Sequence, residues 1–382
     1  MVGIALAFAV LELGGGPAEV GFVLAARTLP MVATLLVGGV VADRMSRRAV
    51  LVTADLVRLG SQGLLAALLV AGEPDLALVG VLAGITGAAA GFAGPAATGL
   101  LPELVAAEDL QEANALRATA LSVGELAGPL LAGALVAVAG PGWALGIDAL
   151  TFGASAGLLL CLPRLARAQR AASTFLADLR DGWTAFRSRR WLWTFVVWAA
   201  VANMVFGAWK VLGPVVAERD LGGAAVWGAI LASLGVGAIV GGLVALRVRP
   251  RRPMLVCAAT ALLCAAPLAT LAATTAPVIV AAGALLAGFS LMLGNTIWES
   301  TVQRHVPQES LSRVSAYDWF GSLALDPIGL AMWGPIAALI GIDAALWVAF
   351  ALLVISGLAL LAVPEIRRLP AFPPRRGQAS TR

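Results

Sequence analysis

Apolar runs of about 20 residues follow one another along almost the whole chain of 382 residues, separated by short polar connectors. A helix of about 20 apolar residues crosses the roughly 30 Å hydrocarbon core of a bilayer, where backbone polar groups must bond within the protein. Only 13% of the residues are charged, whereas a soluble domain carries about 25%. The sequence therefore predicts an all-α membrane protein without a sizeable soluble domain.

Eleven apolar segments are long enough to cross a bilayer as helices. We predict spans at 20–42, 49–71, 76–99, 112–139, 143–162, 191–216, 222–246, 253–273, 277–300, 312–340 and 343–363. A shorter apolar stretch, 1–12, precedes them and is followed by Gly14, Gly15, Gly16 and Pro17, residues that end a helix. The prediction is twelve membrane helices, of which the first is truncated.

Basic residues are unequally distributed between alternate connectors. One side of the membrane receives most of them, among them Arg44, Arg47, Arg48, Arg117, Arg247, Arg249, Arg251, Arg252, Arg304, Arg313 and the arginines of the linker and the tail. The other side receives only Arg27, Lys210 and Arg219. Because positively charged connectors stay in the cytoplasm, we expect both termini on the cytoplasmic side of a bacterial plasma membrane. This distribution accounts for the net charge of +4 without nucleic acid as a partner.

The longest polar connector divides the spans into two groups of six. We expect an N-terminal six-helix bundle at 1–162, a cytoplasmic linker at 163–190, a C-terminal bundle at 191–363 and a cytoplasmic tail at 364–382. Within the linker, Phe175, Leu179, Trp183 and Phe186 recur at helical spacing among arginines, which predicts a helix at the membrane surface. A solvated tether is the alternative.

An internal repeat relates the two groups of spans. Seven residues are matched 201 positions later, namely Val105, Glu108, Leu110, Ala115, Glu125, Gly128 and Gly133 by Val306, Glu309, Leu311, Ala316, Asp326, Gly329 and Gly334. Gly38 and Gly39 are matched 203 positions later by Gly241 and Gly242. An even number of spans separates the copies, so both halves have the same orientation. Two parallel bundles around a central cavity are typical of carriers that work by alternating access.

The connector after the second span reads GGVVADRMSRR, from Gly38 to Arg48. It resembles the signature loop of the major facilitator superfamily, G-x-x-x-D-R-x-x-R-R. The resemblance implies two six-helix bundles related by a pseudo-two-fold axis. It also implies a latch between the bundles, formed by Gly39, Asp43, Arg44, Arg47 and Arg48. The alternative is that these arginines only fix the topology.

The fifth span contains GELAGPLLAG, from Gly124 to Gly133. It resembles the G-x-x-x-G-P motif of exporters in that superfamily, with a different spacing of the glycines after the proline. Gly124, Gly128 and Gly133 thin one helix face for close packing, and Pro129 removes a backbone donor. The motif favours export over uptake, and a packing kink without bearing on direction is the alternative.

Two cytoplasmic segments point to one branch of the superfamily. The stretch from His305 to Trp319 resembles the turn before the eleventh helix in the drug and siderophore exporter branch, which includes enterobactin and macrolide efflux carriers. The linker segment from Asp178 to Trp183 resembles the same branch. The resemblance implies an exported amphipathic small molecule: a drug, a siderophore or a secondary metabolite.

Charged residues inside apolar spans are costly and are rarely kept without a partner or a role. Glu125 and its repeat mate Asp326 lie beside glycine and proline, and they are the first and second candidates for carrying protons. Pairing with Arg or Lys across the bundle interface is the alternative. Asp55 and Arg58 are further candidates, although residues three apart face the same side of a helix and neutralise each other. Asp148 is expected to cap a helix near the outer surface.

A substrate cavity between the bundles needs polar and aromatic residues. The candidates are Asn203, Trp209, Lys210, Trp298, Glu299 and Trp319. Tryptophans in membrane helices also serve in packing or at the interface, which is the alternative for these. Lys210 is expected either to neutralise a buried carboxylate or to contact an anionic substrate.

These patterns predict a secondary active transporter that exports an amphipathic small molecule by alternating access, in exchange for protons. Its expected partners are the substrate, protons and membrane lipids, and we expect a monomer without a cofactor. No metal site is expected, since Cys161, Cys257 and Cys264 lack metal-ligand spacing. No enzyme motif such as GxxxxGK or HExxH occurs. An uncoupled facilitator or importer is one alternative. A lipid-handling or sensory protein on a carrier fold is another.

Overall fold

The computed structural model describes residues 1–72, 74–106, 109–162 and 183–370. Within these residues the regular elements are helices. The first half of the chain forms α1 (Val2–Glu12), α2 (Pro17–Arg44), α3 (Arg47–Ala71), α4 (Leu76–Leu104), α5 (Leu110–Ala139) and α6 (Pro141–Cys161). The second half forms α8 (Arg190–Val216), the π-helical turn η1 (Ala217–Leu221), α9 (Ala224–Ala245), α10 (Pro253–Leu263), α11 (Ala266–Ala273), α12 (Pro277–His305), α13 (Gln308–Leu323), α14 (Asp326–Ile340), α15 (Ile342–Ala362) and α16 (Pro364–Arg368).

The predicted membrane helices are confirmed. In the described part of the chain, ten segments are long and apolar enough to span a bilayer, and the shorter apolar helices Val2–Glu12 and Leu126–Ala139 complete the twelve. The short helix at the start, α1, is almost wholly buried from Ile4 to Val10. It is therefore packed inside the protein despite its length.

Two of the predicted spans, 253–273 and 312–340, are broken in the middle rather than continuous. The breaks lie between α10 and α11 and between α13 and α14. Pro267 and Pro327 cause them, because proline lacks a backbone N–H and its ring clashes with the carbonyl group four residues earlier. Those earlier residues, Leu263 and Leu323, are the last residues of α10 and α13.

The two halves of the chain pack in the same way. A Cβ atom added to Gly38 of α2 would lie 2.7 Å from the carbonyl oxygen of Gly91 and 2.9 Å from the Cα atom of Phe92, both on α4. Gly241 of α9, its repeat mate, lies equally close to Phe289 of α12. The repeat in the sequence therefore corresponds to a repeated helix contact, in which α9 and α12 take the places of α2 and α4.

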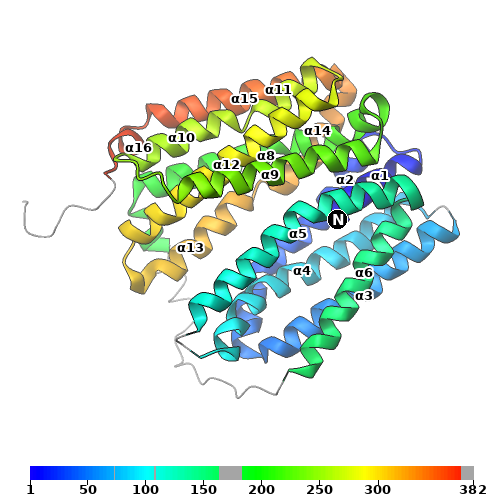
Figure 1. Ribbon diagram of the computed structural model, residues 1–382, viewed down its shortest axis with the longest axis horizontal. Helices are drawn as coiled ribbons and strands as arrows, with labels where there is room; N and C mark the ends of the chain where they lie inside the picture. The colour runs from blue at the N-terminus through cyan, green and yellow to red at the C-terminus, as the bar shows by residue number, and fades with distance from the viewer. Residues whose placement is uncertain (73, 107–108, 163–182, 371–382) are drawn as a thin grey trace, which may run out of the picture.

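Figure 1 shows the helices α1–α6 on one side of the molecule and α8–α16 on the other. We call the end with connectors 45–46, 105–109, 246–252 and 306–307 the arginine-rich end. The end with connectors 13–16, 140, 222–223, 274–276 and 341 is the arginine-poor end. The two halves lie together at the arginine-poor end and diverge toward the arginine-rich end.

Glycines bring the two halves together at the arginine-poor end. A Cβ atom on Gly133 of α5 would lie 2.9 Å from the Cα atom of Gly228 on α9. The repeat mate Gly334 of α14 meets the start of α2, where a Cβ atom would lie 2.6 Å from the amide nitrogen of Ala18. Only glycine permits this approach of two helix backbones.

The predicted surface helix of the linker lies mostly outside the described residues. Its last two aromatic residues are described: the rings of Trp183 and Phe186 stack at 5.8 Å, and both contact Tyr317 of α13, at 5.6 and 5.9 Å. The end of the linker is thus attached to the second half of the chain.

Candidate functional site

Two groups of charged side chains lie within the bundles, away from both ends of the molecule. In the first half they come from α2, α3 and α6. In the second half they are Lys210 of α8 and Asp326 of α14. With a rise of 1.5 Å per residue, Lys210 lies about 30 Å along α8 from its arginine-rich end. Lys210, which the charge count assigned to an outer connector, therefore lies inside α8.

Lys210 and Asp326 form an ion pair, with 2.6 Å between Nζ and Oδ1. Asp326 is buried, with 7% of its side chain exposed, whereas Lys210 keeps 38% of its side chain exposed. Asp326 also lies in the first turn of α14, where the helix dipole favours a negative charge. The structure thus brings together two residues that the sequence singled out separately, and the pair lies within one half rather than across the interface.

The break between α13 and α14 is held by α8. The side-chain amide of Asn203 donates a hydrogen bond of 3.0 Å to the carbonyl oxygen of Ser322, and the indole of Trp333 donates one of 3.0 Å to the carbonyl oxygen of Met204. Asn203, predicted to line a cavity, therefore positions the segment that carries Asp326.

The charged side chains of the first half form a network, which we call the N-half cluster: Arg27, Asp55, Arg58, Gln62 and Asp148. Arg58 pairs with Asp55 at 3.4 Å, as its spacing predicts, and its guanidinium lies 3.8 Å from the centre of the Phe152 ring. Gln62 donates a hydrogen bond of 2.6 Å to Asp148.

Two positions in this cluster correct the sequence analysis. Arg27 was assigned to an outer connector, but it lies inside α2, about 15 Å from the first residue of that helix. Asp148 was expected to cap a helix, but α6 begins two turns earlier, at Pro141. Gly140, with φ +86°, and Pro141 make that earlier start possible, because proline suits the first turn of a helix.

The predicted latch is described only in part. The structure does not describe the surroundings of Gly39 or the side chains of Asp43 and Arg44. Arg47 bonds Glu103 at the end of α4, at 2.7 Å. Arg48 donates hydrogen bonds of 2.7 and 2.6 Å to the last carbonyl oxygens of α6, those of Leu159 and Leu160. These bonds tie α3 to its neighbours in the first half, and a role as a latch stays a prediction.

Replacing Arg48 by alanine is expected to lower the free energy of unfolding by about 1–2 kcal/mol, because a charged donor leaves the negative end of α6. Thermal unfolding of the purified protein in detergent measures the change. Arg219→Ala is the matched control, since the Arg219 side chain is 64% exposed at the other end of the molecule. Equal shifts for both variants would contradict the capping role.

The glycines of the predicted exporter motif have different surroundings. Gly133 is in the interface with α9. A Cβ atom on Gly128 would meet the amino group of Met1 at an ordinary 3.7 Å, and one on Gly124 would meet nothing within 4 Å. Pro129 lies inside α5, which continues through it. The side chain of Glu125 lies outside the described side chains, so its proton-carrying role stays a prediction.

Of the predicted cavity residues, two are packed in the core. Trp209 is 2% exposed, with its ring 4.6 Å from that of Trp227. Trp298 is 4% exposed, stacks on Phe195 at 4.1 Å, and donates a hydrogen bond of 2.9 Å to Asp318. Packing, the alternative for these tryptophans, is what the structure shows.

Two other predicted cavity residues remain accessible. Trp319 of α13 is 60% exposed. Glu299 of α12 is exposed as well, with its carboxylate 3.4 Å from the side-chain amide of Asn295, one turn away on the same face. A polar stripe on a membrane helix is stable only where it meets protein or water. These residues are therefore available to line a water-filled cleft.

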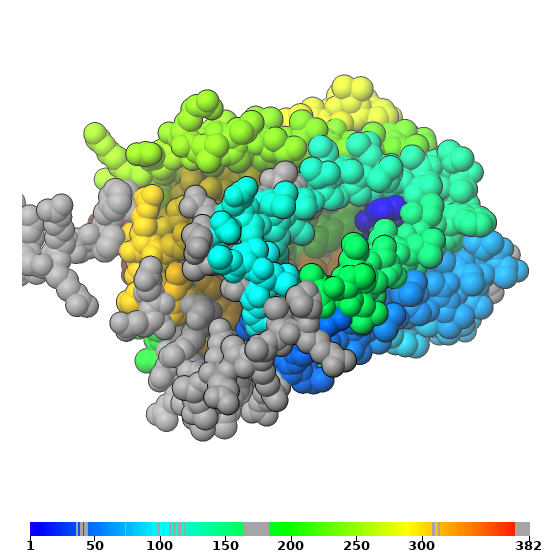
Figure 2. Space-filling view, turned by 60° about the horizontal axis from the view of Figure 1, so that its bottom comes forward, coloured from blue at the N-terminus to red at the C-terminus, as the bar shows by residue number. Residues whose placement is uncertain are grey.

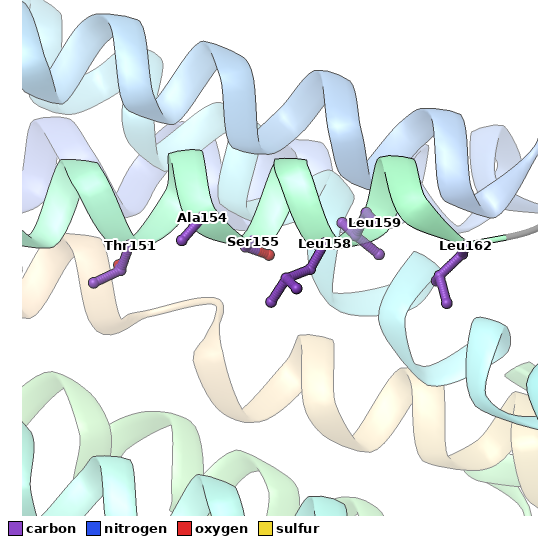
Figure 3. A pocket seen from close by; sticks show the side chains of 6 residues that line it. All are labelled: Thr151, Ala154, Ser155, Leu158, Leu159 and Leu162. Carbon is purple, nitrogen blue, oxygen red and sulfur yellow. The ribbon is translucent and has the colours of Figure 1, made fainter.

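One face of α6 lines an apolar trough that the sequence analysis missed. Its volume is about 460 Å³, and its lining residues are Thr151, Ala154, Ser155, Leu158, Leu159 and Leu162. Figure 3 shows all six along one side of the helix. In the space-filling view a hollow opens between α5 and α6, and the start of the chain is visible in it (Figure 2). The three- and four-residue spacing of the six lining residues predicts that they share one helix face. The spacing does not predict that neighbouring helices leave this face uncovered.

The family profile described as Major Facilitator Superfamily matches residues 1–324. The chain belongs to the major facilitator superfamily. It is thus a transporter-family protein, and its many apolar helices make it a multi-pass membrane protein.

Two curated relatives are enterobactin exporters. The chain is 30% identical over 350 residues to the enterobactin exporter EntS of Salmonella choleraesuis strain SC-B67, covering 89% of this chain and 82% of the relative. It is 27% identical over 382 residues to the enterobactin exporter EntS of Escherichia coli O1:K1, covering 98% and 90%. The exporter branch predicted from the cytoplasmic segments is confirmed by these relatives.

Solved structures share the fold. The nucleoside transporter NupG superposes with a TM-score of 0.75 at 14% identity, covering 95% of this chain and 94% of that one. A bacterial homologue of the human lysosomal transporter Spinster, in an inward-facing and unoccupied conformation, superposes with a TM-score of 0.71 at 14% identity, covering 96% and 95%. At such identities the likeness concerns the fold alone.

Proposed function

We propose that this protein exports an amphipathic small molecule from the bacterial cytoplasm by alternating access, in exchange for protons. The observation that carries the proposal is the arrangement of the two repeated halves, which meet through Gly133 and Gly334 at one end and diverge toward the other. The N-half cluster and the ion pair of Lys210 with Asp326 lie between the two ends of the molecule. The names of the enterobactin exporters support export as the direction.

The positive-inside rule places the arginine-rich end in the cytoplasm. In that orientation the end of the chain is cytoplasmic, whereas Met1, which was expected there too, lies inside the bundle beside Gly128 of α5. The conformation is open to the cytoplasm and closed to the outside. Rocking of one half against the other, which separates the contacts of Gly133 and Gly334, would then expose the same residues to the outside.

Proton exchange would run through carboxylates at membrane depth. Asp326 is a candidate because it is buried and forms an ion pair with Lys210, 2.6 Å away. A proton on Asp326 would release Lys210, whose side chain is partly exposed, and a change of charge at such a pair is a means of biasing a two-state element. Glu125, its repeat mate, is the equivalent candidate in the first half.

Proteoliposomes containing the full chain are expected to show substrate-dependent proton flux, with naturally produced siderophores and dyes as a substrate panel. Asp326→Asn and Glu125→Gln are each expected to uncouple proton flux from substrate movement. Substrate equilibration without any proton flux would support a facilitator and contradict exchange. No substrate movement in either direction would contradict transport and favour a lipid-handling or sensory role.

A further inference from the structure

The N-half cluster contains buried polar atoms that the described residues leave without a hydrogen bond. Among the described residues, the Nε atom of Arg27 is buried and has no hydrogen-bond partner. The Nε atom of Arg58 and the Oε1 atom of Gln62 in the same cluster share this state. Buried polar atoms nearly always have partners, so each such atom calls for an explanation. The described residues do not supply partners for these three atoms of one cluster.

The electrostatics of the cluster specify the charge of that molecule. Arg27 and Arg58 lie within range of mutual repulsion, while Asp148 attracts both. Asp55 is already paired with Arg58, and Asp148 already accepts a short hydrogen bond from Gln62. Among the described residues, the Nε atom of Arg27 thus has no hydrogen-bond partner, although Asp148 attracts the guanidinium, and a planar acid group is the partner that suits it.

We propose that Arg27, with Arg58 beside it, binds the acidic head group of the transported substrate. The exported molecule is then an amphipathic anion, a class that carries a carboxylate or a comparable acid group. This inference rests on the proposed function and adds the substrate class to it. Asp148 is the competing carboxylate, which partly neutralises Arg27 when the site is empty.

The position of the cluster supports a solute rather than a lipid head group. Arg27 lies about 15 Å along α2 from one end and about 26 Å from the other, near the middle of the bilayer. Lipid head groups lie at the two surfaces instead. The apolar trough begins one turn from Asp148 on the same helix, so it offers a surface for the apolar part of the molecule.

The test is equilibrium dialysis of the full chain in detergent with a matched pair of probes, 2-naphthoate and the neutral 2-naphthamide. We expect saturable binding of the acid at least about tenfold tighter than that of the amide. Arg27→Gln should weaken binding of the acid about tenfold or more, and Arg219→Gln, at an exposed site, should not. Asp148→Asn should strengthen it several-fold, because it removes the competing carboxylate. A purely structural role for the cluster predicts no such gain.

Equal binding of acid and amide, absence of saturable acid binding, or full binding by a folded Arg27→Gln variant would each overturn the inference. Displacement of the acid by phosphatidylglycerol would also overturn it, in favour of a lipid head group. Transport is measured separately in proteoliposomes. Flux of a neutral substrate without Arg27-dependent binding would contradict the anion site but not the proposed export function. Arg27-dependent binding without any flux would contradict export but not the anion site.

Discussion

Replacing Lys210 by methionine is expected to lower the free energy of unfolding by about 2–4 kcal/mol and to abolish transport. Removing one member of a buried ion pair costs about 3–5 kcal/mol, because the other charge stays buried without compensation. The expectation here is smaller because 38% of the Lys210 side chain is exposed and partly screened by solvent. Unfolding followed by tryptophan fluorescence in a denaturing detergent titration measures the change.

The double variant Lys210→Met with Asp326→Leu is the control. It removes both charges, so it should recover most of the lost stability, since apolar replacement of a buried pair is often neutral or stabilising. Transport should stay abolished if the pair acts in coupling. A double variant as unstable as Lys210→Met alone would show that the cost arises from packing around Lys210 rather than from an uncompensated Asp326.

Replacing Gly133 by valine is expected to separate the two halves at the arginine-poor end and to stop transport. A Cβ atom at this position would lie 2.5 Å from the carbonyl oxygen of Ala224 and 2.9 Å from the Cα atom of Gly228. Both are backbone atoms, which cannot yield as a flexible side chain does, and overpacking of this kind costs about 1–3 kcal/mol or more. The arrangement in which the two halves touch at this end would therefore be less populated than arrangements in which they are apart.

Distances between spin labels at Val138 of α5 and Arg219 of η1, both exposed near this end, measure this separation. The matched control is Gly124→Val, nine residues earlier on the same helix, where an added Cβ atom meets nothing within 4 Å. The control should keep the distance distribution of the unchanged protein. If both variants gave the same distances, the contact between α5 and α9 would not be what closes this end.

Much of the fold follows from the sequence because its signals are periodic and long. Apolar runs predict the helices, and the 201-residue repeat predicts the symmetry down to single contacts. Gly140 and Gly341, also 201 residues apart, both have φ +86° and make the same turn, from α5 to α6 and from α14 to α15. The breaks after Leu263 and Leu323 were missed, although Pro267 and Pro327 are their physical cause, because an apolar run with one proline still reads as a span.

The candidate site was harder to predict, since it depends on helix rotation and on contacts between distant residues. Lys210 and Asp326 lie 116 positions apart, and only the packing of α8 on α14 shows that they meet. Arg27 was overlooked because the charge count placed it in a connector, whereas α2 begins earlier, at Pro17. Trp209 and Trp298 were predicted to line a cavity from their residue type, but both are buried in the core.

The two broken helices make the halves mechanically unequal. The fifth helix of the first half, α5, is continuous through Pro129, while its counterpart in the repeat is divided into α13 and α14. Both helices lack the backbone donor of a proline, but between α13 and α14 the helix ends and restarts across Ala324 and Leu325. This joint therefore bends at lower cost than the continuous α5. Asp326 stands directly after such a joint. The second half can thus flex around its ion pair, while the first half moves as a stiffer block.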